Sequence, residues 1–275
     1  MKFFIILFLI GSNVLLYGQQ ISGTVFDKNS ETPIEFVNIG IVGKNIGTVS
    51  DQNGNYTLQI SPEYHNDTLL FSYIGYHSYY VGVSDFINLN SRNAYLEPKK
   101  IELAEVIIRP RPYRVEERTL GVTTRNIRLE GCLRDSINGM ELGLLIKNDN
   151  RIFLKEINLN VSECTYDSVF YRINIYKARS DLQFENILTN TVYVNFSRKE
   201  VNDKIIIDLR QIYIELIGDF LVTFEAVKYL GNGFLCFSAC LDHETYVRRA
   251  SQGTWETAPL GMSISVLVDV EIKEN

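Results

Sequence analysis

The residues that could support hydrolytic metal chemistry are few, because the 275-residue sequence contains only three histidines, His65, His77 and His243. A zinc hydrolase needs three protein ligands and one open position for water, so closely spaced His and Glu residues are its usual signature. No histidine begins a His-x-x-Glu pattern, and the His-Glu-x-x-His motif that starts at His243 has Val247 at its last position. We therefore predict no metal site, no cofactor and no peptidase activity.

Other catalytic arrangements are equally weak in the sequence. A serine nucleophile needs a histidine base, but Gly-x-Ser-x-Gly does not occur and His243 is the only imidazole in the second half of the chain. Paired carboxylates for glycoside cleavage meet only in space, and the available candidates are Glu215, Glu225 and Glu256. Antiparallel strands often carry acids on a solvated face, so we expect these three at the surface. The sequence therefore predicts no catalytic residues.

Asp51, Asn53 and Asn55 repeat the opening of a calcium-binding loop. An EF-hand places Gly sixth and a bidentate Glu twelfth, whereas here Gly54 is fourth and Pro62 is twelfth. Asp and Asn side chains also accept hydrogen bonds from neighbouring backbone groups in turns. The pattern therefore indicates a tight turn in which Gly54 supplies a positive φ.

The residues best suited to binding a ligand lie between Tyr246 and Trp255. Flat aromatic rings stack on sugars or peptides, and guanidinium groups supply forked hydrogen-bond donors. The segment offers both, because Arg248 and Arg249 lie between Tyr246 and the only tryptophan of the chain. These four residues are the candidate binding residues. The alternative is that Trp255 anchors the core, as large aromatic side chains usually do, and a buried Trp255 would exclude this site.

The sequence contains four cysteines. Cys132 lies just before its midpoint, and Cys164, Cys236 and Cys240 lie in its second half. An exported protein permits disulfides. If residues 234–240 form a strand, Cys236 and Cys240 lie roughly 13 Å apart, beyond the ~7 Å that a disulfide spans. The Cys-x-x-Cys spacing of metal sites does not occur. We expect buried, unpaired thiols, with the disulfide status of the four residues left open.

The hydrophobic pattern that must position these residues has the period of β-strands. Val37, Ile39 and Ile41 share one face of a segment, and roughly six or seven such short segments before residue 98 predict a small antiparallel sandwich. Beyond residue 121, roughly eight to ten longer segments predict a jelly-roll-like two-sheet sandwich. There Arg172 and Asn174 lie opposite an apolar face, and only residues 209–216 have the pattern of a short helix. The predicted fold class is all-β.

Charge and hydropathy exclude several partners. The formal net charge is −6 with no long basic block, which argues against nucleic acid as a partner. Met1 and Lys2 precede an apolar run that ends near Gly18, a pattern typical of a cleaved signal peptide. No later run reaches the ~18 apolar residues of a membrane-spanning helix, so we expect no transmembrane helix in the mature chain.

Residues 98–120 are rich in charge and contain Arg109-Pro110-Arg111-Pro112. Closely spaced prolines favour an extended path and cannot donate backbone hydrogen bonds. We therefore predict a semi-rigid linker. The expected organisation is a signal peptide over residues 1–18, a first β-sandwich over 19–97, the linker over 98–120 and a second β-sandwich over 121–275.

Several motifs of the first domain occur in the order found in a known family. They are Ile21-Ser-Gly-Thr-Val-Phe-Asp27, Thr32-Pro-Ile-Glu-Phe-Val-Asn-Ile39, Gly47-Thr-Val-Ser-Asp-Gln-Asn-Gly-Asn-Tyr56 and Phe71-Ser-Tyr-Ile-Gly-Tyr76. Together they resemble the carboxypeptidase-regulatory-like domain. The resemblance implies a transthyretin-like fold and the module found at the amino terminus of SusC-type TonB-dependent receptors. Residues 103–108 are similar to the stretch that follows the module in those receptors. The second domain resembles no family of known function.

These observations predict a non-enzymatic, exported cell-envelope protein, periplasmic or associated with the outer membrane of a Gram-negative bacterium. We expect an adapter or binding module associated with outer-membrane transport or surface assembly, with an envelope protein or a glycan as its partner. Exposed strand edges would offer main-chain pairing to such a partner. Two alternatives remain: a glycan-binding module in nutrient capture, and a carbohydrate-active enzyme whose acids the sequence does not pair.

Overall fold

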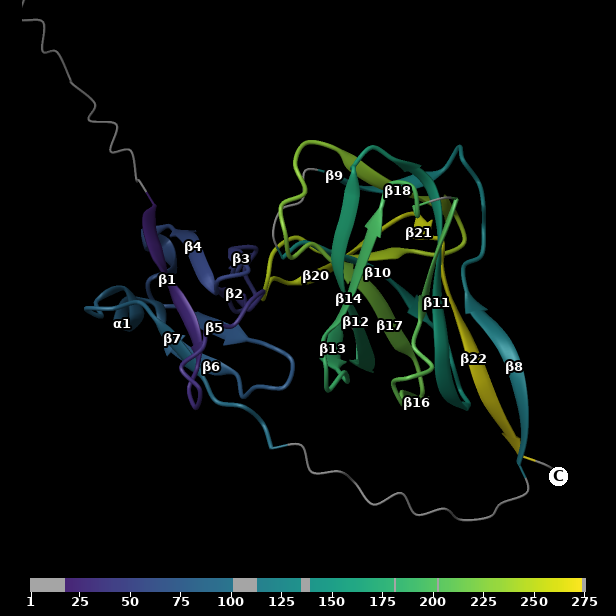
Figure 1. Ribbon diagram of the computed structural model, residues 1–275, viewed down its shortest axis with the longest axis horizontal. Helices are drawn as coiled ribbons and strands as arrows, with labels where there is room; N and C mark the ends of the chain where they lie inside the picture. Colours follow the sequence, from purple (N-terminus) through teal and green to yellow (C-terminus); the bar gives the residue numbers. More distant parts are fainter. Residues whose placement is uncertain (1–17, 101–112, 135–138, 181, 202, 274–275) are drawn as a thin grey trace, which may run out of the picture.

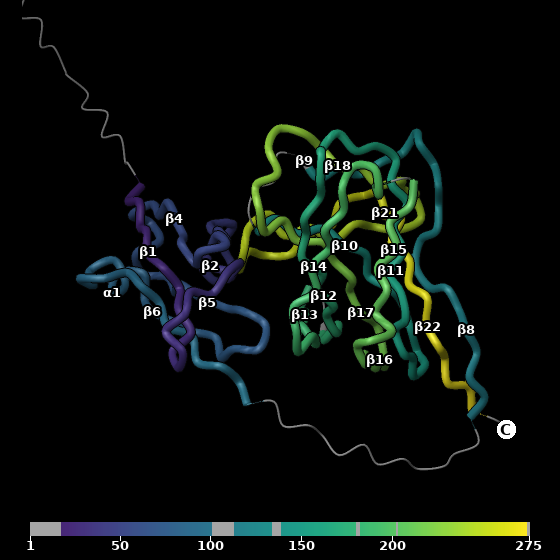
Figure 2. The backbone as a smooth tube through the Cα atoms, in the orientation of Figure 1, coloured from purple at the N-terminus to yellow at the C-terminus, as the bar shows by residue number. Residues whose placement is uncertain are grey.

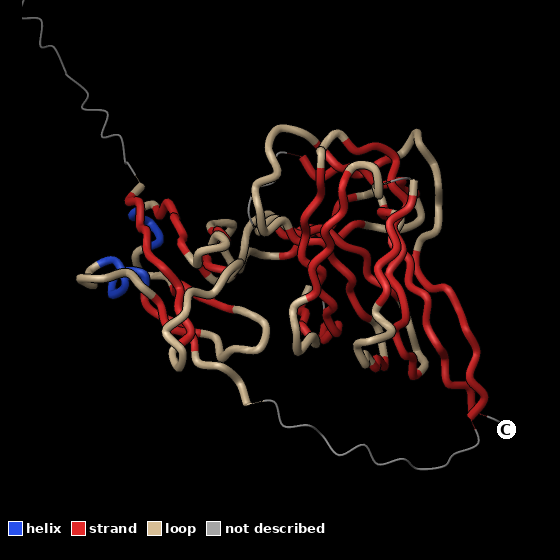
Figure 3. The backbone as a smooth tube through the Cα atoms, in the orientation of Figure 1, coloured by secondary structure: helices blue, strands red, loops and turns tan. Residues whose placement is uncertain are grey.

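The computed structural model describes residues 18–100, 113–134, 139–180, 182–201 and 203–273. Figure 1 shows two β-rich domains side by side, the first formed by the amino-terminal part of the chain. The predicted all-β fold class is confirmed, and the helices of the described residues occur only in the first domain (Figure 3). The predicted signal peptide lies outside the described residues except for Gly18. Within the described ranges, no helix has the length and apolar character needed to cross a membrane.

The first domain is a sandwich of two small sheets, with the orders β4-β1-β7 and β3-β2-β5-β6. On β4, Tyr56, Leu58 and Ile60 are buried and alternate with exposed residues, so that each sheet turns one apolar face toward the shared core. Phe86 of the short helix completes this core. The elements are β1 (Gln19–Asp27), β2 (Asn38–Ile41), β3 (Gly47–Val49), β4 (Asn55–Ile60), η1 (Pro62–Tyr64), β5 (Thr68–Ser72), β6 (Tyr79–Gly82), α1 (Val83–Ile87) and β7 (Ala94–Leu96).

The turn predicted at residues 51–55 is present. The Oδ1 atom of Asp51 accepts hydrogen bonds from the backbone N–H groups of Asn53 and Asn55, both at 2.8 Å. Gly54 has a φ of 75°, and an added Cβ there would lie 2.8 Å from the carbonyl oxygen of Val25. These hydrogen bonds and the positive φ of Gly54 are those of the tight turn that the spacing indicated.

The second domain is a larger two-sheet sandwich, as predicted. One sheet has seven strands, in the order β13-β12-β17-β10-β19-β20 with β14 beside β12. The other has eight, in the order β21-β18-β11-β22-β8, with β15 and β16 beside β11 and β9 beside β18. Their apolar faces enclose one core that includes Ile173, Val222, Phe237 and Val268. The strands are β8 (Tyr113–Gly121), β9 (Glu130–Arg134), β10 (Glu141–Ile146), β11 (Arg151–Cys164), β12 (Ser168–Ser180), β13 (Gln183–Asn186), β14 (Val192–Ser197), β15 (Lys204–Asp208), β16 (Glu215–Ile217), β17 (Phe220–Glu225), β18 (Phe234–Cys240), β19 (Thr245–Arg248), β20 (Trp255–Ala258), β21 (Gly261–Met262) and β22 (Ile264–Lys273).

Two predictions about irregular segments are wrong. The linker predicted over residues 98–120 ends earlier, because β8 pairs along its whole length with β22 (Figure 2). β8 lies at the edge of the sheet, and most of its charged side chains are exposed to solvent there. Residues 209–214 form turns instead of a helix, because Leu209 and Ile214 are both drawn into the core beside β16. Arg109 to Pro112, on which the linker prediction was based, lies outside the described residues.

Cys132 and Cys236 form a disulfide, so the expectation of unpaired thiols is wrong for this pair. The two residues lie directly opposite each other on β9 and β18, with their Cα atoms 4.0 Å apart. Sheet pairing therefore joins positions 104 residues apart in sequence. Cys164 and Cys240 are free cysteines, but both are only partly buried instead of fully buried.

The two domains meet in a packed interface. Phe36 and Val49 of the first domain form a buried apolar cluster with Val227 of the second, and Phe170 and Tyr193 pack against it. The rings of Phe36 and Phe170 lie 5.4 Å apart, and those of Phe36 and Tyr193 lie 5.6 Å apart. This apolar contact removes aromatic surface of both domains from water, which favours a fixed arrangement.

A loop of the second domain lies against the β2–β3 hairpin. The backbone N–H of Gly43 donates a hydrogen bond to the carbonyl oxygen of Gln252 at 2.9 Å. The Nε2 atom of Gln252 in turn donates to the Oγ atom of Ser72 at 2.7 Å. A Cβ at Gly47 would lie 2.2 Å from the carbonyl oxygen of Ser251, so the absence of a side chain permits this close approach.

Gly47→Ala is therefore expected to destabilise the full chain by about 1–3 kcal/mol, the usual cost of overpacking, and to loosen the docking of the domains. Thermal unfolding and the radius of gyration from small-angle scattering would measure the two effects. Gly131→Ala is the control, because its Cβ would meet only the flexible side chain of Met262, at 3.1 Å. Equal losses in both variants would contradict the role given to Gly47.

Candidate functional site between the domains

A row of charged side chains crosses the seven-stranded sheet on the face turned toward the first domain. Arg248 on β19 lies opposite Glu141 on β10, Glu141 lies opposite Glu225 on β17, and Glu225 lies opposite Arg172 on β12. Directly opposite residues of neighbouring strands point to the same face of a sheet. We call these four residues the charged row. Trp255 on β20 extends the line beyond Arg248.

Three of the four residues of the charged row are buried, and Arg248 at its end is partly exposed. Glu141 and Glu225 are fully buried, and Arg172 is 2% exposed. All six residues of β17 are buried, and Glu225 at the end of this strand contacts Asn38 of the first domain. The expectation that Glu225 is a surface residue is therefore wrong.

The other two acids considered for catalysis lie in separate ion pairs nearer the surface. Arg151 Nη1 lies 2.5 Å from an oxygen of Glu215, and Arg249 pairs with Glu256. The three predicted acids therefore do not form one site. Glu225 instead meets Glu141, an acid that the sequence analysis did not select.

Groups from the first domain complete the Glu225 end of the row. Arg172 Nε donates to Glu225 Oε2 at 3.0 Å, and Arg172 Nη1 donates to the carbonyl oxygen of Phe36 at 2.7 Å. Arg172 Nη2 donates to Asn38 Oδ1, and Asn38 Nδ2 donates to Glu225 Oε1 at 2.6 Å. Burial is the largest single effect on the pKa of Arg172 and lowers it, but the charge of Glu225, the hydrogen bond to Glu225 and the nearby Tyr193 and Tyr176 together raise that pKa overall.

The Glu141 end is built mainly by the second domain. Asn174 Nδ2 donates to Glu141 Oε1 at 2.9 Å and to Glu225 Oε2 at 2.8 Å, and so links the two carboxylates. Tyr176 donates its hydroxyl to Glu141 Oε1 at 2.9 Å, and Arg248 Nη2 donates to Glu141 Oε2. Burial, and then the charge of Glu141, raise the pKa of Tyr176 well above its ordinary value, so Tyr176 remains a neutral donor. Two cations balance two anions, as buried charges require.

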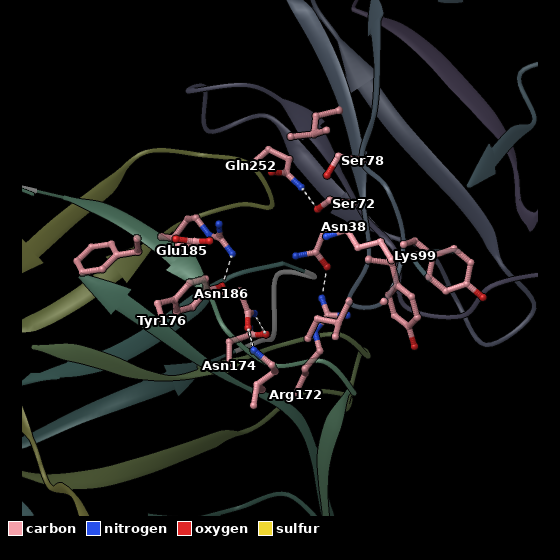
Figure 4. A pocket seen from close by; sticks show the side chains of 18 of the residues that line it. Asn38, Ser72, Ser78, Lys99, Arg172, Asn174, Tyr176, Glu185, Asn186 and Gln252 are labelled. Atoms are coloured by element: carbon pink, nitrogen blue, oxygen red, sulfur yellow. Dashed lines mark hydrogen bonds between the residues drawn. The ribbon is translucent and has the colours of Figure 1, made fainter. Parts of the chain in front are cut away.

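A cavity of about 440 Å³ lies between the domains beside this row. Its volume falls within the ~300–1,000 Å³ range of small-molecule sites. Figure 4 shows its polar side chains: Asn38, Ser72, Ser78 and Lys99 come from the first domain, and Arg172, Asn174, Tyr176, Glu185, Asn186 and Gln252 come from the second. The cavity is therefore a place where a ligand would touch both domains.

The structure brings only part of the predicted binding cluster to this cavity. Arg248 lines the cavity and stacks on Trp255, with its guanidinium carbon 4.9 Å from the ring centroid. Trp255 is half-buried and packs edge-on against Phe184, which also lines the cavity. Tyr246 also packs edge-on against Phe184 and lines a second cavity. Arg249 follows the end of β19 and pairs with Glu256 at the surface.

Asn38 and Glu141 were not among the predicted site residues, and Arg172 and Asn174 were predicted only as polar residues of a strand. Alternation along β12 placed Arg172 and Asn174 on its polar face. A polar face of a strand can be covered by solvent or by another domain, and the alternation does not distinguish these. Large hydrogen-bonding residues such as Arg, Asn and Tyr at alternate positions are the available signal, because they suit a buried polar contact better than a solvated face.

One group of potential metal ligands occurs among the described residues. Glu130, Cys132 and Cys236 place candidate ligand atoms within 4.8 Å of one another. Both sulfur atoms are joined in the disulfide, so neither can act as the thiolate that a metal requires. The residues present fit a disulfide and not a metal centre.

The fold and the interface define a two-domain all-β protein with a polar cavity between its domains. Residues 21–108 match the family described as the CarboxypepD_reg-like domain. The first domain is therefore a CarboxypepD_reg-like module, which confirms the resemblance found in the sequence motifs.

Part of this chain is similar to part of a receptor. The chain is 30% identical over 105 residues to TonB-dependent receptor P3 of Formosa agariphila, a match that covers 38% of this chain and 10% of the receptor. This chain thus spans only a small part of the length of that relative. Among solved structures, those of the Gx and Gt strains of infectious bursal disease virus are each 10% identical, with TM-scores of 0.25 and 0.23. They cover 88% and 93% of this chain and 62% and 64% of the viral chains, at a similarity too low to support any argument.

Proposed function

We propose that the protein is a non-enzymatic component of the cell envelope, an adapter or binding module associated with outer-membrane transport or surface assembly in a Gram-negative bacterium. The observation that carries the proposal is the match of residues 21–108 to a module shared with a TonB-dependent receptor. In this proposal the protein is exported and its partner is another envelope protein.

The docking of the domains supports the adapter role. The β3-β2-β5-β6 sheet supplies Asn38 and Ser72 to the interface. The other sheet ends at β4, whose outward residues Thr57 and Gln59 are exposed. A strand at the end of a sheet can pair with a segment of another protein through its backbone. The module can thus be held by the second domain while it presents β4 to a partner.

The engagement of the buried acids supports a non-enzymatic role. Glu141 and Glu225 each accept hydrogen bonds from an arginine and from Asn174. Carboxylates held in this way serve as fixed acceptors, whereas a general acid needs a proton to give. Their arrangement is that of a domain contact.

Photo-crosslinking in intact cells tests the adapter role. A photoreactive residue at Thr57 on β4 is expected to form an adduct with an integral outer-membrane protein, and the protein is expected in the envelope fraction. The same probe at exposed Lys199 in the second domain is the control and is expected to give no such adduct. Recovery in the cytoplasm, or polysaccharide turnover that Glu256→Gln abolishes, would contradict the proposal.

A second candidate is a glycan-binding module, which the aromatic group beside the cavity favours. Trp255, Phe184 and Tyr176 pack edge-on with ring centroids 5.4–6.4 Å apart, next to hydroxyl and amide groups that match the chemistry of sugars. Calorimetric titration with a panel of polysaccharides tests it. Saturable binding that Trp255→Leu abolishes would support this candidate, and no binding by the wild-type protein would exclude it.

A further inference from the structure

Two cationic side chains of the cavity have unused hydrogen-bond donors. Lys99 of the first domain lines the cavity, and no ion pair or side-chain hydrogen bond engages it among the described residues. Arg248 of the second domain bonds through Nη2 to Glu141 and Tyr176. Its Nε atom has no partner but is buried out of reach of solvent, and its Nη1 atom, which has no partner within the described ranges, is the donor left for a ligand. Buried guanidinium donors are normally satisfied, so Arg248 has capacity left for a ligand.

Arg172 shows the contrast within the same row. Its three guanidinium nitrogens are all engaged, by Glu225, Asn38 and the Phe36 carbonyl oxygen. Arg172 therefore holds the domains together. Arg248 has the same charge and a similar place in the sheet, but only one of its nitrogens is used.

The charge balance of the cavity favours an anion. The acid that lines it, Glu185, is already paired with Arg179, and Arg172 and Arg248 are paired with the two buried glutamates. Lys99 is the charge that these pairs leave uncompensated. A carboxylate suits both cationic side chains, because charge-assisted hydrogen bonds to it are the strong ones.

Neutral polar groups surround the two cations. Ser72 accepts a hydrogen bond from Gln252, which leaves its own hydroxyl proton to donate. The hydroxyl of Ser78 has no hydrogen bond among the described residues, and the amide of Asn186 lines the opposite side in Figure 4. The rings of Tyr73 and Tyr80 also line the cavity. These groups suit a ligand that carries hydroxyl groups on a compact frame.

We propose that the cavity between the domains binds a small organic carboxylate that also carries hydroxyl groups. Lys99 and Arg248 receive the carboxylate, and Ser72, Ser78 and Asn186 bind the hydroxyls. Such a ligand contacts both domains and stabilises their docked arrangement. This inference goes beyond the adapter role and does not depend on it, because a ligand site and a partner strand lie on different parts of the molecule.

A comparison of two sugars that differ in one group tests the carboxylate directly. Isothermal titration of the full chain with D-glucuronate is expected to show saturable binding at one site, with D-glucose at least about tenfold weaker. The fluorescence of Trp255 is expected to change with glucuronate, because Arg248 lies on its ring. Equal affinity for the two sugars, or no binding of glucuronate, would overturn the proposal.

Two lysine variants locate the site without disturbing the fold. Lys99→Gln is expected to weaken glucuronate binding about tenfold, the usual effect of losing one charge-assisted hydrogen bond, and to leave the unfolding temperature unchanged. Lys28→Gln is the matched control, because that lysine is exposed in the same domain and pairs with Glu97. Unaltered binding in Lys99→Gln, or an equal loss in both variants, would overturn the proposal. Neither result bears on photo-crosslinking from Thr57, so the two proposals fail separately.

Discussion

Replacing Arg172 with methionine is expected to lower the free energy of unfolding of the full chain by about 3–5 kcal/mol, as measured by urea titration followed by circular dichroism. Methionine is apolar and fills a similar space, but it leaves the fully buried carboxylate of Glu225 without its counter-charge. The carbonyl oxygen of Phe36 loses its donor as well. An unpaired buried charge costs far more than the hydrogen bonds that held it.

The same variant should also loosen the contact between the domains. Arg172 belongs to the second domain, and two of its hydrogen bonds reach Phe36 and Asn38 of the first. Small-angle scattering is therefore expected to give a larger radius of gyration for Arg172→Met than for the wild-type protein. An unchanged radius would show that the aromatic cluster around Phe36 is sufficient to hold the domains.

Arg151→Met is the control for Arg172→Met, because it breaks an ion pair at the surface instead of a buried one. The side chain of Arg151 is 46% exposed and that of its partner Glu215 is 29% exposed, so its loss should cost no more than about 1 kcal/mol. The double variant Arg172→Met/Glu225→Leu removes both buried charges and should recover part of the loss. Equal destabilisation by Arg172→Met and Arg151→Met would show that the charged row contributes no more than a surface pair.

Removing the disulfide is expected to destabilise the second domain by about 2–5 kcal/mol. The bond closes a loop between residues 104 positions apart, and closing a long loop removes many conformations from the unfolded chain. It also fixes β9, which pairs only with β18 among the described strands. Thermal unfolding of the double variant Cys132→Ala/Cys236→Ala would measure the effect.

The free cysteines provide the control for this prediction. Cys164 is half-buried and unpaired, so Cys164→Ala should change the unfolding temperature little. A reductant should lower the unfolding temperature of the wild-type protein and of Cys164→Ala, but not that of the double variant. A wild-type protein that is insensitive to the reductant would show that the disulfide does not stabilise the fold.

The alternation of apolar and polar residues predicted the strands well where one face of the strand is apolar. The alternation on β4 and the turn at Asp51 are present as expected, because burial on one side and backbone hydrogen bonds within a few residues decide both. The prediction for residues 113–120 was wrong, because an edge strand with both charges and exposed positions has the composition of a linker. Only the pairing of residues 113–121 with β22 distinguishes an edge strand from a linker here.

The candidate site was predictable only in its outer part. Arg248 and Trp255 were recognised as binding residue types, and they do lie against each other beside a cavity. Glu141 and Asn38 were not, since an isolated acid or amide on a strand has the same local sequence whether water or another domain covers it. The disulfide was missed for a similar reason, because no short-range signal pairs Cys132 with Cys236.

The sequence by itself determined many of the strands, the CarboxypepD_reg-like module and the polar face of β12, because these depend on side-chain period and on neighbouring residues. Only the tertiary structure decided that Arg172, Glu225 and Glu141 form one buried row under the first domain. Their contacts join strands and domains far apart in the chain, and the electrostatic energy of a charge depends on what surrounds it in space.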